Sequence, residues 1–238
     1  MSVRAASVRG FSLIELLVVL AVATILLGLL MPTFRQLRES ARQIVCANNQ
    51  HQIGIALQTY ATDNNDRLPY TVFAERPERP QDMMALHAGG GDSRLWDGIG
   101  LLYKTRLLRS PETFYCPAHK GDHIYAADVD LWQRPGARPL YSNYHYRGLF
   151  ENRSISEFGL DRLQTMQQGM ALMSDGLRLK SDFNHETGAN ILRTDLSVRW
   201  VVDSERTIIT LLPDSATQTW PTRIWKTIDI KIADSLVK

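Results

Sequence analysis

The sequence predicts an α+β fold in which a long N-terminal helix packs on a C-terminal antiparallel β-sheet domain with long loops. Three observations lead to this prediction. The chain opens with an apolar run that holds a single charged residue, and the next thirty residues space their apolar side chains as a helix does. The remainder carries short alternating or β-branched segments, separated by Gly-rich and Pro-rich stretches, which are typical of strands and loops.

The apolar run extends from Phe11 to Met31 and contains 21 residues. A helix of that length rises about 31 Å, which is the thickness of the hydrocarbon core of a bilayer. No small-residue site for a signal peptidase follows the run. We therefore expect an uncleaved membrane-spanning helix, with Arg4 and Arg9 holding the N-terminus in the cytoplasm.

The single charge in this run, Glu15, needs an explanation because a carboxylate at the bilayer centre costs about 3 kcal/mol. Residues 10–15, GFSLIE, resemble the processing site of type IV prepilins and type II secretion pseudopilins. The resemblance implies that a prepilin peptidase cuts between Gly10 and Phe11, that Phe11 is then N-methylated, and that Glu15 sets the register of each subunit during membrane assembly. The new ammonium at Phe11 would neutralise the acid. The alternative is a plain signal anchor, in which Glu15 is an interfacial acid without a partner.

This interpretation divides the chain into four parts. Residues 1–10 are a leader peptide, residues 11–31 the transmembrane and assembly helix, residues 32–62 an amphipathic helix, and residues 63–238 a globular α+β domain. By resemblance to pilins, Pro32 is expected to kink the helix. A cluster of short polar residues followed by a proline, TDNNDRLP, is expected to end it.

The amphipathic helix carries two apolar stripes at helical spacing. One consists of Phe34, Leu37, Ala41 and Ile44, and the other of Cys46, Ile53, Leu57 and Tyr60. We expect the first stripe to face neighbouring filament subunits and the second to pack under the globular domain.

In the domain, the pattern predicts one short amphipathic helix within Trp96–Ser110, which Pro111 ends. It also predicts five strand segments: Tyr141–Gly148, Gly169–Asp175, Ala189–Asp203, Thr207–Pro213 and Trp225–Ile232. The third contains a polar interruption, so it is expected to form a hairpin that turns at Arg193–Leu196.

A second resemblance involves His185 and Asp195, which are separated by nine residues. This spacing is similar to the C-terminal signature, His, nine residues, Asp-Gly, of a pilin-like family abundant in planctomycetes. Members also show a helical segment like residues 41–64 and a Cys-Pro pair like Cys116-Pro117. The glycine of the signature is Leu196 here, so the turn is expected to be of another type, because glycine adopts positive φ at low cost.

We expect His185 and Asp195 to form a structural hydrogen bond that ties a loop to the hairpin turn. The alternative is a base with its orienting acid or a pair of metal ligands, but a triad needs a nucleophile and a metal site needs further donors. Other polar residues that qualify, namely Ser174, Asp175 and His145, show no recognisable spacing.

We expect no metal site. His119 and His123 lie near Cys116, but Pro117 and Gly121 oppose the helix that would bring the three side chains together. Calcium is an alternative of low weight, because some pseudopilins bind it and the chain has acidic stretches at residues 63–66 and 122–130, but neither matches an EF-hand loop.

The chain has two cysteines, Cys46 and Cys116. Outside the cytoplasm they can form a disulfide that links the helix to the domain and adds about 4 kcal/mol of stability in the chain-entropy model. Alternatively Cys46 lies in a subunit contact, and both possibilities stay open.

Charge argues against binding to nucleic acids. The whole chain has 27 basic and 25 acidic residues, and loss of a leader carrying Arg4 and Arg9 leaves 25 of each (27 − 2 = 25). Domains that bind nucleic acid through bulk charge usually have a basic excess.

The favoured function is therefore a non-catalytic structural subunit of a type IV pilus or a type II secretion pseudopilus. Its expected partners are a prepilin peptidase/methyltransferase, other pilin or pseudopilin subunits and the cytoplasmic membrane, with the globular domain on the extracytoplasmic side. One alternative is an adhesion module with a binding surface made of Trp132, Tyr141, Tyr144 and Tyr146. A less favoured alternative is a membrane-anchored hydrolase that uses His185 and Asp195.

Overall fold

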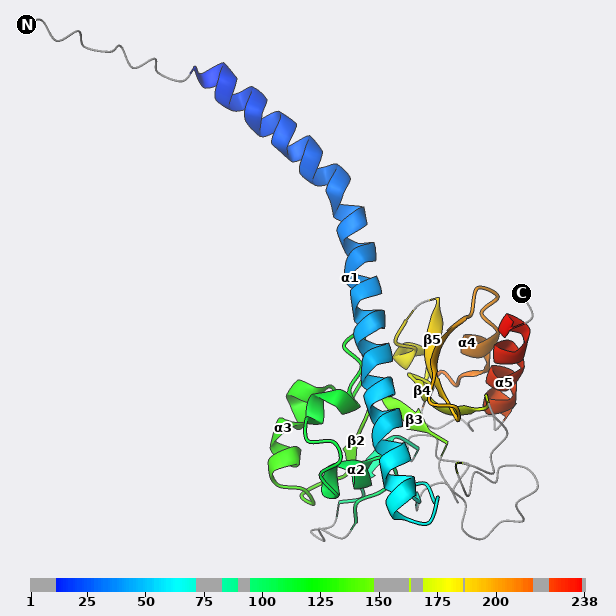
Figure 1. Ribbon diagram of the computed structural model, residues 1–238. Helices are drawn as coiled ribbons and strands as arrows, with labels where there is room; N and C mark the ends of the chain where they lie inside the picture. Colours follow the sequence, from blue (N-terminus) through cyan, green and yellow to red (C-terminus); the bar gives the residue numbers. More distant parts are fainter. Residues whose placement is uncertain are drawn as a thin grey trace, which may run out of the picture. The chain divides into compact units, whose positions relative to one another are not determined.

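A computed structural model describes residues 12–71, 83–89, 95–147, 163, 169–185, 187–215 and 223–236 (Figure 1). The chain divides into two compact units, Met1–Ala41 and Arg42–Lys238. The second unit contains all the strands that the structure describes.

Helix α1, Leu13–Asp63, is 51 residues long. It includes both the apolar run and the amphipathic segment, and it continues through Pro32, so the kink at that residue stays a prediction. The helix ends where expected: Asp66 donates its backbone N–H to Ala61 O, and Asn65 and Asp66 both adopt positive φ, which reverses the chain.

The two stripes of α1 differ in exposure as predicted. Cys46, Ile53 and Leu57 are buried in the core of the second unit, with Tyr60 packed against them, whereas Phe34, Leu37 and Ile44 are exposed.

The main sheet has four antiparallel strands in the order β3 (Tyr144–Tyr146), β4 (Ala171–Asp175), β5 (Gly188–Arg193) and β6 (Val198–Val202). The predicted hairpin is confirmed, since β5 and β6 pair from Gly188 and Val202 to Leu192 and Val198. A second, two-stranded sheet joins β1 (Ala85–His87) to β2 (Leu140–Tyr141).

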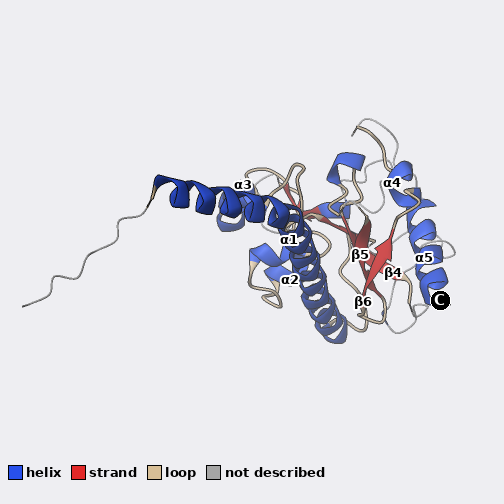
Figure 2. Cartoon of the chain, turned by 90° about the horizontal axis from the view of Figure 1, so that it is seen from above, coloured by secondary structure: helices blue, strands red, loops and turns tan. Residues whose placement is uncertain are grey.

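Within the second unit, helices cover both faces of the main sheet (Figure 2). On one face, Cys46, Ile53 and Leu57 of α1 pack in one core with Leu172 and Leu192. The core on the other face joins the sheet to α4 (Thr207–Leu211) and α5 (Arg223–Leu236), and it contains Ala171, Ala189, Ile191, Val201, Ile208, Ile224, Trp225, Ile228 and Ile232. Strands β4 and β5 are therefore buried along their whole length.

The predicted strands Thr207–Pro213 and Trp225–Ile232 are wrong, because these segments form α4 and α5. Helix α4 begins where the Asp203 carboxylate accepts the backbone N–H groups of Ile208 and Ile209, at 2.9 to 3.0 Å. In α5 the buried residues recur at helical spacing.

The predicted helix within Trp96–Ser110 is present but short: α2 spans Gly100–Lys104 and stops before Arg106, which has positive φ. Helix α3, Tyr125–Gln133, and two 3₁₀ turns, η3 (Pro111–Phe114) and η5 (Lys180–Asp182), complete the described elements.

The turn between β5 and β6 is closed by two backbone hydrogen bonds, and whether its type differs from that of a turn with glycine stays a prediction. Leu196 donates its N–H to Arg193 O, and Arg193 donates to Ser197 O, both at 2.9 Å. Leu196 itself has a φ of 64°. The leucine therefore adopts the left-handed conformation, which glycine adopts at lower cost.

Candidate functional site

The N-terminal end of α1 has a built-in cap. Ser12 precedes the first helical residue, and its backbone N–H donates to Glu15 Oε2 at 2.8 Å. This is the acidic half of a capping box, in which the third helical residue reaches back to satisfy a terminal N–H. Gly10 and Phe11, the predicted cleavage residues, lie outside the described part of the chain.

The first turns of α1 present apolar side chains on all sides. The large apolar residues from Leu13 to Met31 are exposed. Within the residues that the structure describes, α1 is the one helix long and apolar enough to cross a membrane. An exposed helix that is apolar all round is suited to a lipid environment.

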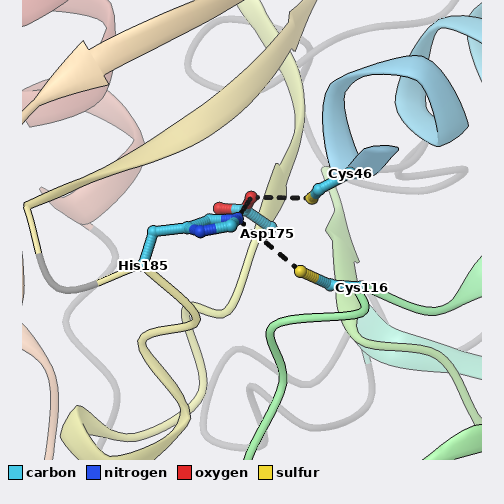
Figure 3. A group of neighbouring side chains, drawn as sticks. All are labelled: Cys46, Cys116, Asp175 and His185. Atoms are coloured by element: carbon cyan, nitrogen blue, oxygen red, sulfur yellow. Dashed lines mark hydrogen bonds and ion pairs between the residues drawn. The ribbon is translucent and has the colours of Figure 1, made fainter. Parts of the chain in front are cut away.

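A second site lies inside the globular unit, where four chemically active side chains meet (Figure 3). Cys46 comes from α1, Cys116 follows η3, Asp175 ends β4, and His185 precedes β5. Their ligand atoms, two sulfurs, a carboxylate oxygen and an imidazole nitrogen, all lie within 4.8 Å of one another. All four side chains are buried.

The contacts in this cluster are close. The Cys46 thiol donates to Asp175 Oδ2 at 3.0 Å. His185 Nε2 lies 3.4 Å from the same oxygen and 3.7 Å from Cys116 Sγ. The His185 ring also packs edge-on against Trp200, with 5.5 Å between ring centroids.

Hydrogen bonds from the surrounding elements hold these side chains in place. Asn190 of β5 donates its backbone N–H to Asp175 Oδ1 at 3.2 Å and its amide to Oδ2 at 3.1 Å. Gln50 Nε2 lies 4.0 Å from Cys46 Sγ and donates to Asn190 O at 3.0 Å. Asn143 Oδ1 accepts the backbone N–H of Cys116 at 3.1 Å. The cluster is therefore supported by polar groups of α1, β5 and the segment before β3.

Burial changes the acidity of the groups here. It raises the pKa of the Cys46 thiol well above the usual range, and the hydrogen bond with Cys116 and the charge of Asp175 raise that pKa further, while His185 acts in the opposite direction. Burial also raises the pKa of the nearby Tyr144 phenol. Both groups therefore stay protonated at neutral pH in the cluster as it stands.

The arrangement does not match a nucleophile, base and acid triad. In a triad, one imidazole nitrogen faces the nucleophile and the other faces the acid. Here the same nitrogen, His185 Nε2, faces both the Cys116 sulfur and the Asp175 carboxylate. The cluster is built as a set of converging donors and not as a proton relay.

The predicted tether between His185 and Asp195 is wrong. The two residues lie beyond opposite ends of β5, whose six residues span about 17 Å. His185 faces Asp175, whereas Asp195 accepts hydrogen bonds from Ser197 and pairs with Arg193 at 3.2 Å. These local contacts lower the pKa of Asp195 against the effect of its partial burial.

The sulfur atoms of the two cysteines lie within 4.8 Å of each other, as expected for a pair that can form a disulfide. Both cysteines are nevertheless free thiols. The structure thus contains no disulfide between Cys46 and Cys116, and it buries Cys46 inside its own chain instead of at a subunit contact.

The other residues considered for metal binding or adhesion have different surroundings. His119 contacts Asn184 Oδ1 and Asp122 O, and His123 stacks on Tyr141 with 4.7 Å between centroids. In the acidic stretch 122–130, Asp122 pairs with Arg178 and Asp128 with Arg138. The aromatic residues proposed for adhesion are mostly inaccessible, because Trp132, Tyr144 and Tyr146 are buried.

The sequence contains all four members of the cluster but no pattern that predicts their convergence. The sequence leaves a disulfide between Cys46 and Cys116 as one of two possibilities, predicts a contact between His185 and Asp195, and indicates no partner for Asp175. Asp175 and His185 are ten positions apart (185 − 175), but Cys46 and Cys116 lie far from them, and no spacing typical of a metal motif connects the four. The apolar stripe of Cys46, Ile53, Leu57 and Tyr60 is the one sequence feature that predicts burial of a cluster member.

Comparison with known families gives two matches. Residues 6–31 match the family described as "Prokaryotic N-terminal methylation motif", and residues 35–99 match the family described as "Protein of unknown function (DUF1559)". No curated protein and no solved structure shows a significant match to the chain. The methylation motif, the second match and the apolar N-terminal helix together support a type IV pilin-like protein with a single membrane anchor.

Proposed function

We propose that this chain is the precursor of a structural subunit that a prepilin peptidase cleaves between Gly10 and Phe11, methylates at Phe11, and releases for assembly into a type IV pilus or a type II secretion pseudopilus. The observation that carries the proposal is the methylation motif at residues 6–31, which overlaps the one described helix suited to a membrane. The globular domain lies on the extracytoplasmic side.

The capped helix end gives this proposal a physical basis. Before cleavage, the Glu15 carboxylate accepts the N–H of Ser12. Cleavage places a charged amine on the residue next to Ser12, where it meets the same carboxylate or that of a neighbouring subunit. A charge pair in a medium of low dielectric is much stronger than one in water, so Glu15 changes from a helix cap into an assembly contact.

The exposed stripe of α1 supplies a second contribution to assembly. Phe34, Leu37 and Ile44 form an apolar surface beyond the membrane-length segment. Packing this surface against the helices of neighbouring subunits removes it from water. In this function the domain is structural and catalyses no reaction.

Mass spectrometry of the N-terminus from native membranes tests the processing step. The expected chain starts at methylated Phe11, and it should appear as the full-length precursor in a strain without the peptidase. A polypeptide that still begins at Met1 in cells with an active peptidase would contradict the proposal.

Filament formation tests the assembly step. Glu15→Val should be processed normally but should fail to enter filaments. Glu205→Val, which removes an exposed acid of the globular domain, is the matched control and should assemble as the unmodified chain does. Equal assembly of the two variants would show that the Glu15 carboxylate has no role in subunit contacts.

A further inference from the structure

We propose that Cys46, Cys116, Asp175 and His185 form a closed, four-coordinate site for a zinc-type divalent cation inside the globular unit. This inference is independent of the proposed function, because it rests on the domain core and not on the N-terminal motif.

The first argument is geometric. A tetrahedral zinc ion with bonds of about 2.0 to 2.3 Å holds its donor atoms about 3.3 to 3.8 Å apart. The contacts in the cluster are 3.0 Å from Cys46 Sγ to Asp175 Oδ2, 3.4 Å from that oxygen to His185 Nε2, and 3.7 Å from Nε2 to Cys116 Sγ. All six separations are below 4.8 Å, so small side-chain shifts are enough to place the four donors around one ion.

The second argument is the chemistry of the donor set. Two cysteine sulfurs, one imidazole nitrogen and one carboxylate oxygen are each common zinc ligands, and four protein ligands are typical of structural zinc sites. Thiolates favour zinc over magnesium or calcium, which prefer oxygen ligands alone. With both thiols ionised the donors carry three negative charges, and a divalent cation reduces that buried charge to one.

The third argument is the support around the donors. Two hydrogen bonds from Asn190 orient the Asp175 carboxylate. The Gln50 amide donates to the Asn190 carbonyl and also lies 4.0 Å from the Cys46 sulfur. Such an outer layer of hydrogen bonds is what fixes ligands in metal sites.

One member of the cluster borders the surface. Cys116 lines a surface cleft of about 530 Å³, together with Val45, Asn49 and Tyr115. The other three members do not line this cleft.

A disulfide between Cys46 and Cys116 is the competing use of the same sulfurs. It would involve neither Asp175 nor His185, although both side chains meet the two sulfurs. Metal binding uses all four side chains, which makes it the better account of their convergence.

A bound ion would connect α1, the segment after η3, the end of β4 and the segment before β5. Because Cys46 and Cys116 lie far in the sequence from each other and from the other two ligands, each ligand bond adds to the free energy of folding. The ion would have no open coordination position, so its role would be structural and not catalytic.

The test uses the full chain, purified in detergent with a reducing agent and without chelators. Elemental analysis should find about one zinc ion per chain, as a closed structural site holds. Replacement by cobalt should give the visible absorption of a tetrahedral site together with a sulfur-to-cobalt charge-transfer band. Cys46→Ser and His185→Gln should each lose the ion and the cobalt spectrum.

His119→Gln is the matched control, because His119 lies three residues from Cys116 but contacts Asn184 and Asp122 instead of the cluster. It should keep the ion. Far-ultraviolet circular dichroism shows whether each variant folds. If a variant is unfolded, the unmodified chain decides the question: after removal of zinc with a chelator, two thiols should become reactive that were protected before.

Three results would overturn the proposal. The first is an intact mass lower by two hydrogens, with no bound metal, in a second preparation purified without the reducing agent, which shows a disulfide. The second is a chain with two free thiols that takes up neither zinc nor cobalt. The third is metal that stays bound in Cys46→Ser and His185→Gln but is lost in His119→Gln, which places the ion elsewhere.

Discussion

Arg147 and Asp229 form an ion pair, with 3.0 Å between Nη1 and Oδ2, that attaches α5 to the main sheet. The same two side chains also bond to Ala171 of β4, since Arg147 donates to its carbonyl at 3.1 Å and Asp229 accepts its N–H at 2.8 Å. The Arg147 guanidinium lies over the ring of Trp225, 5.6 Å from its centroid. These contacts together connect α5 to β4 and to Arg147, the residue that follows β3.

The first prediction concerns this pair. Asp229→Asn should lower the free energy of unfolding by about 3 kcal/mol, because it leaves the buried charge of Arg147 without a counter-charge. Urea denaturation of the full chain in detergent measures the change. The control is Asp214→Asn, whose carboxylate lies 2.9 Å from Lys180 but is 68% exposed, and it should cost less than about 1 kcal/mol. Similar losses in the two variants would show that burial does not strengthen the Arg147 pair.

The second prediction concerns the hairpin turn. Leu196 has a φ of 64°, a conformation that is costly for a residue with a Cβ. Leu196→Gly should therefore raise the free energy of unfolding by about 0.5 to 1 kcal/mol. Leu196→Ala separates the effect of backbone strain from the effect of losing the leucine side chain, because alanine is shorter but keeps the Cβ. It should give no gain in the free energy of unfolding. Equal effects of glycine and alanine would mean that strain at this position is not what limits stability.

The sequence was sufficient to predict the long helix, its buried stripe and the β5–β6 hairpin, because each has a clear period over many residues. It was misleading for α5. There Ile228, Ile230 and Ile232 alternate with polar residues and predict a strand, yet Ile230 is 52% exposed while Ile228 and Ile232 are buried. Tertiary packing against the sheet selected the four-residue spacing over the two-residue spacing.

The buried cluster was beyond prediction for a different reason. Cys46 and His185 are 139 positions apart (185 − 46), and only the pairing of β4 with β5 beneath α1 brings their side chains together. Metal motifs are found in sequences when their ligands stand at short fixed spacings. A site assembled from four separate elements has no such pattern.

The third prediction uses two glycines of α1. A Cβ at Gly54 would lie 2.9 Å from Leu192 Cδ1 of β5, whereas nothing lies within 4 Å of a Cβ at Gly28. Gly54→Leu should destabilise the domain by about 1 to 3 kcal/mol through overpacking between helix and sheet. Gly28→Leu should leave domain unfolding unchanged. Urea denaturation followed by tryptophan fluorescence compares the two variants. An unchanged midpoint for Gly54→Leu would show that Leu192 and the sheet move aside without loss of stability.

The last prediction concerns pH and His145 of β3. Burial lowers the pKa of this histidine to about 3, and the charges of Arg178 and His119 act in the same direction. The neutral form is the one that fits, because Nδ1 accepts the N–H of Leu177 at 3.2 Å. In the unfolded chain the pKa is about 6.5, so the unfolded state binds a proton in the interval between these values and the folded state does not.

Stability from His145 is therefore complete above about pH 6.5 and is lost progressively as the pH falls toward 3. Between pH 7 and pH 5 the loss should be about 2 kcal/mol. His145→Asn keeps an acceptor for Leu177 but does not titrate, so its free energy of unfolding should fall by about 2 kcal/mol less over the same interval. Other groups, including His123, whose pKa burial also lowers, titrate in both proteins and cancel in the comparison. If the two proteins lose stability in parallel, His145 must take up its proton without unfolding the domain.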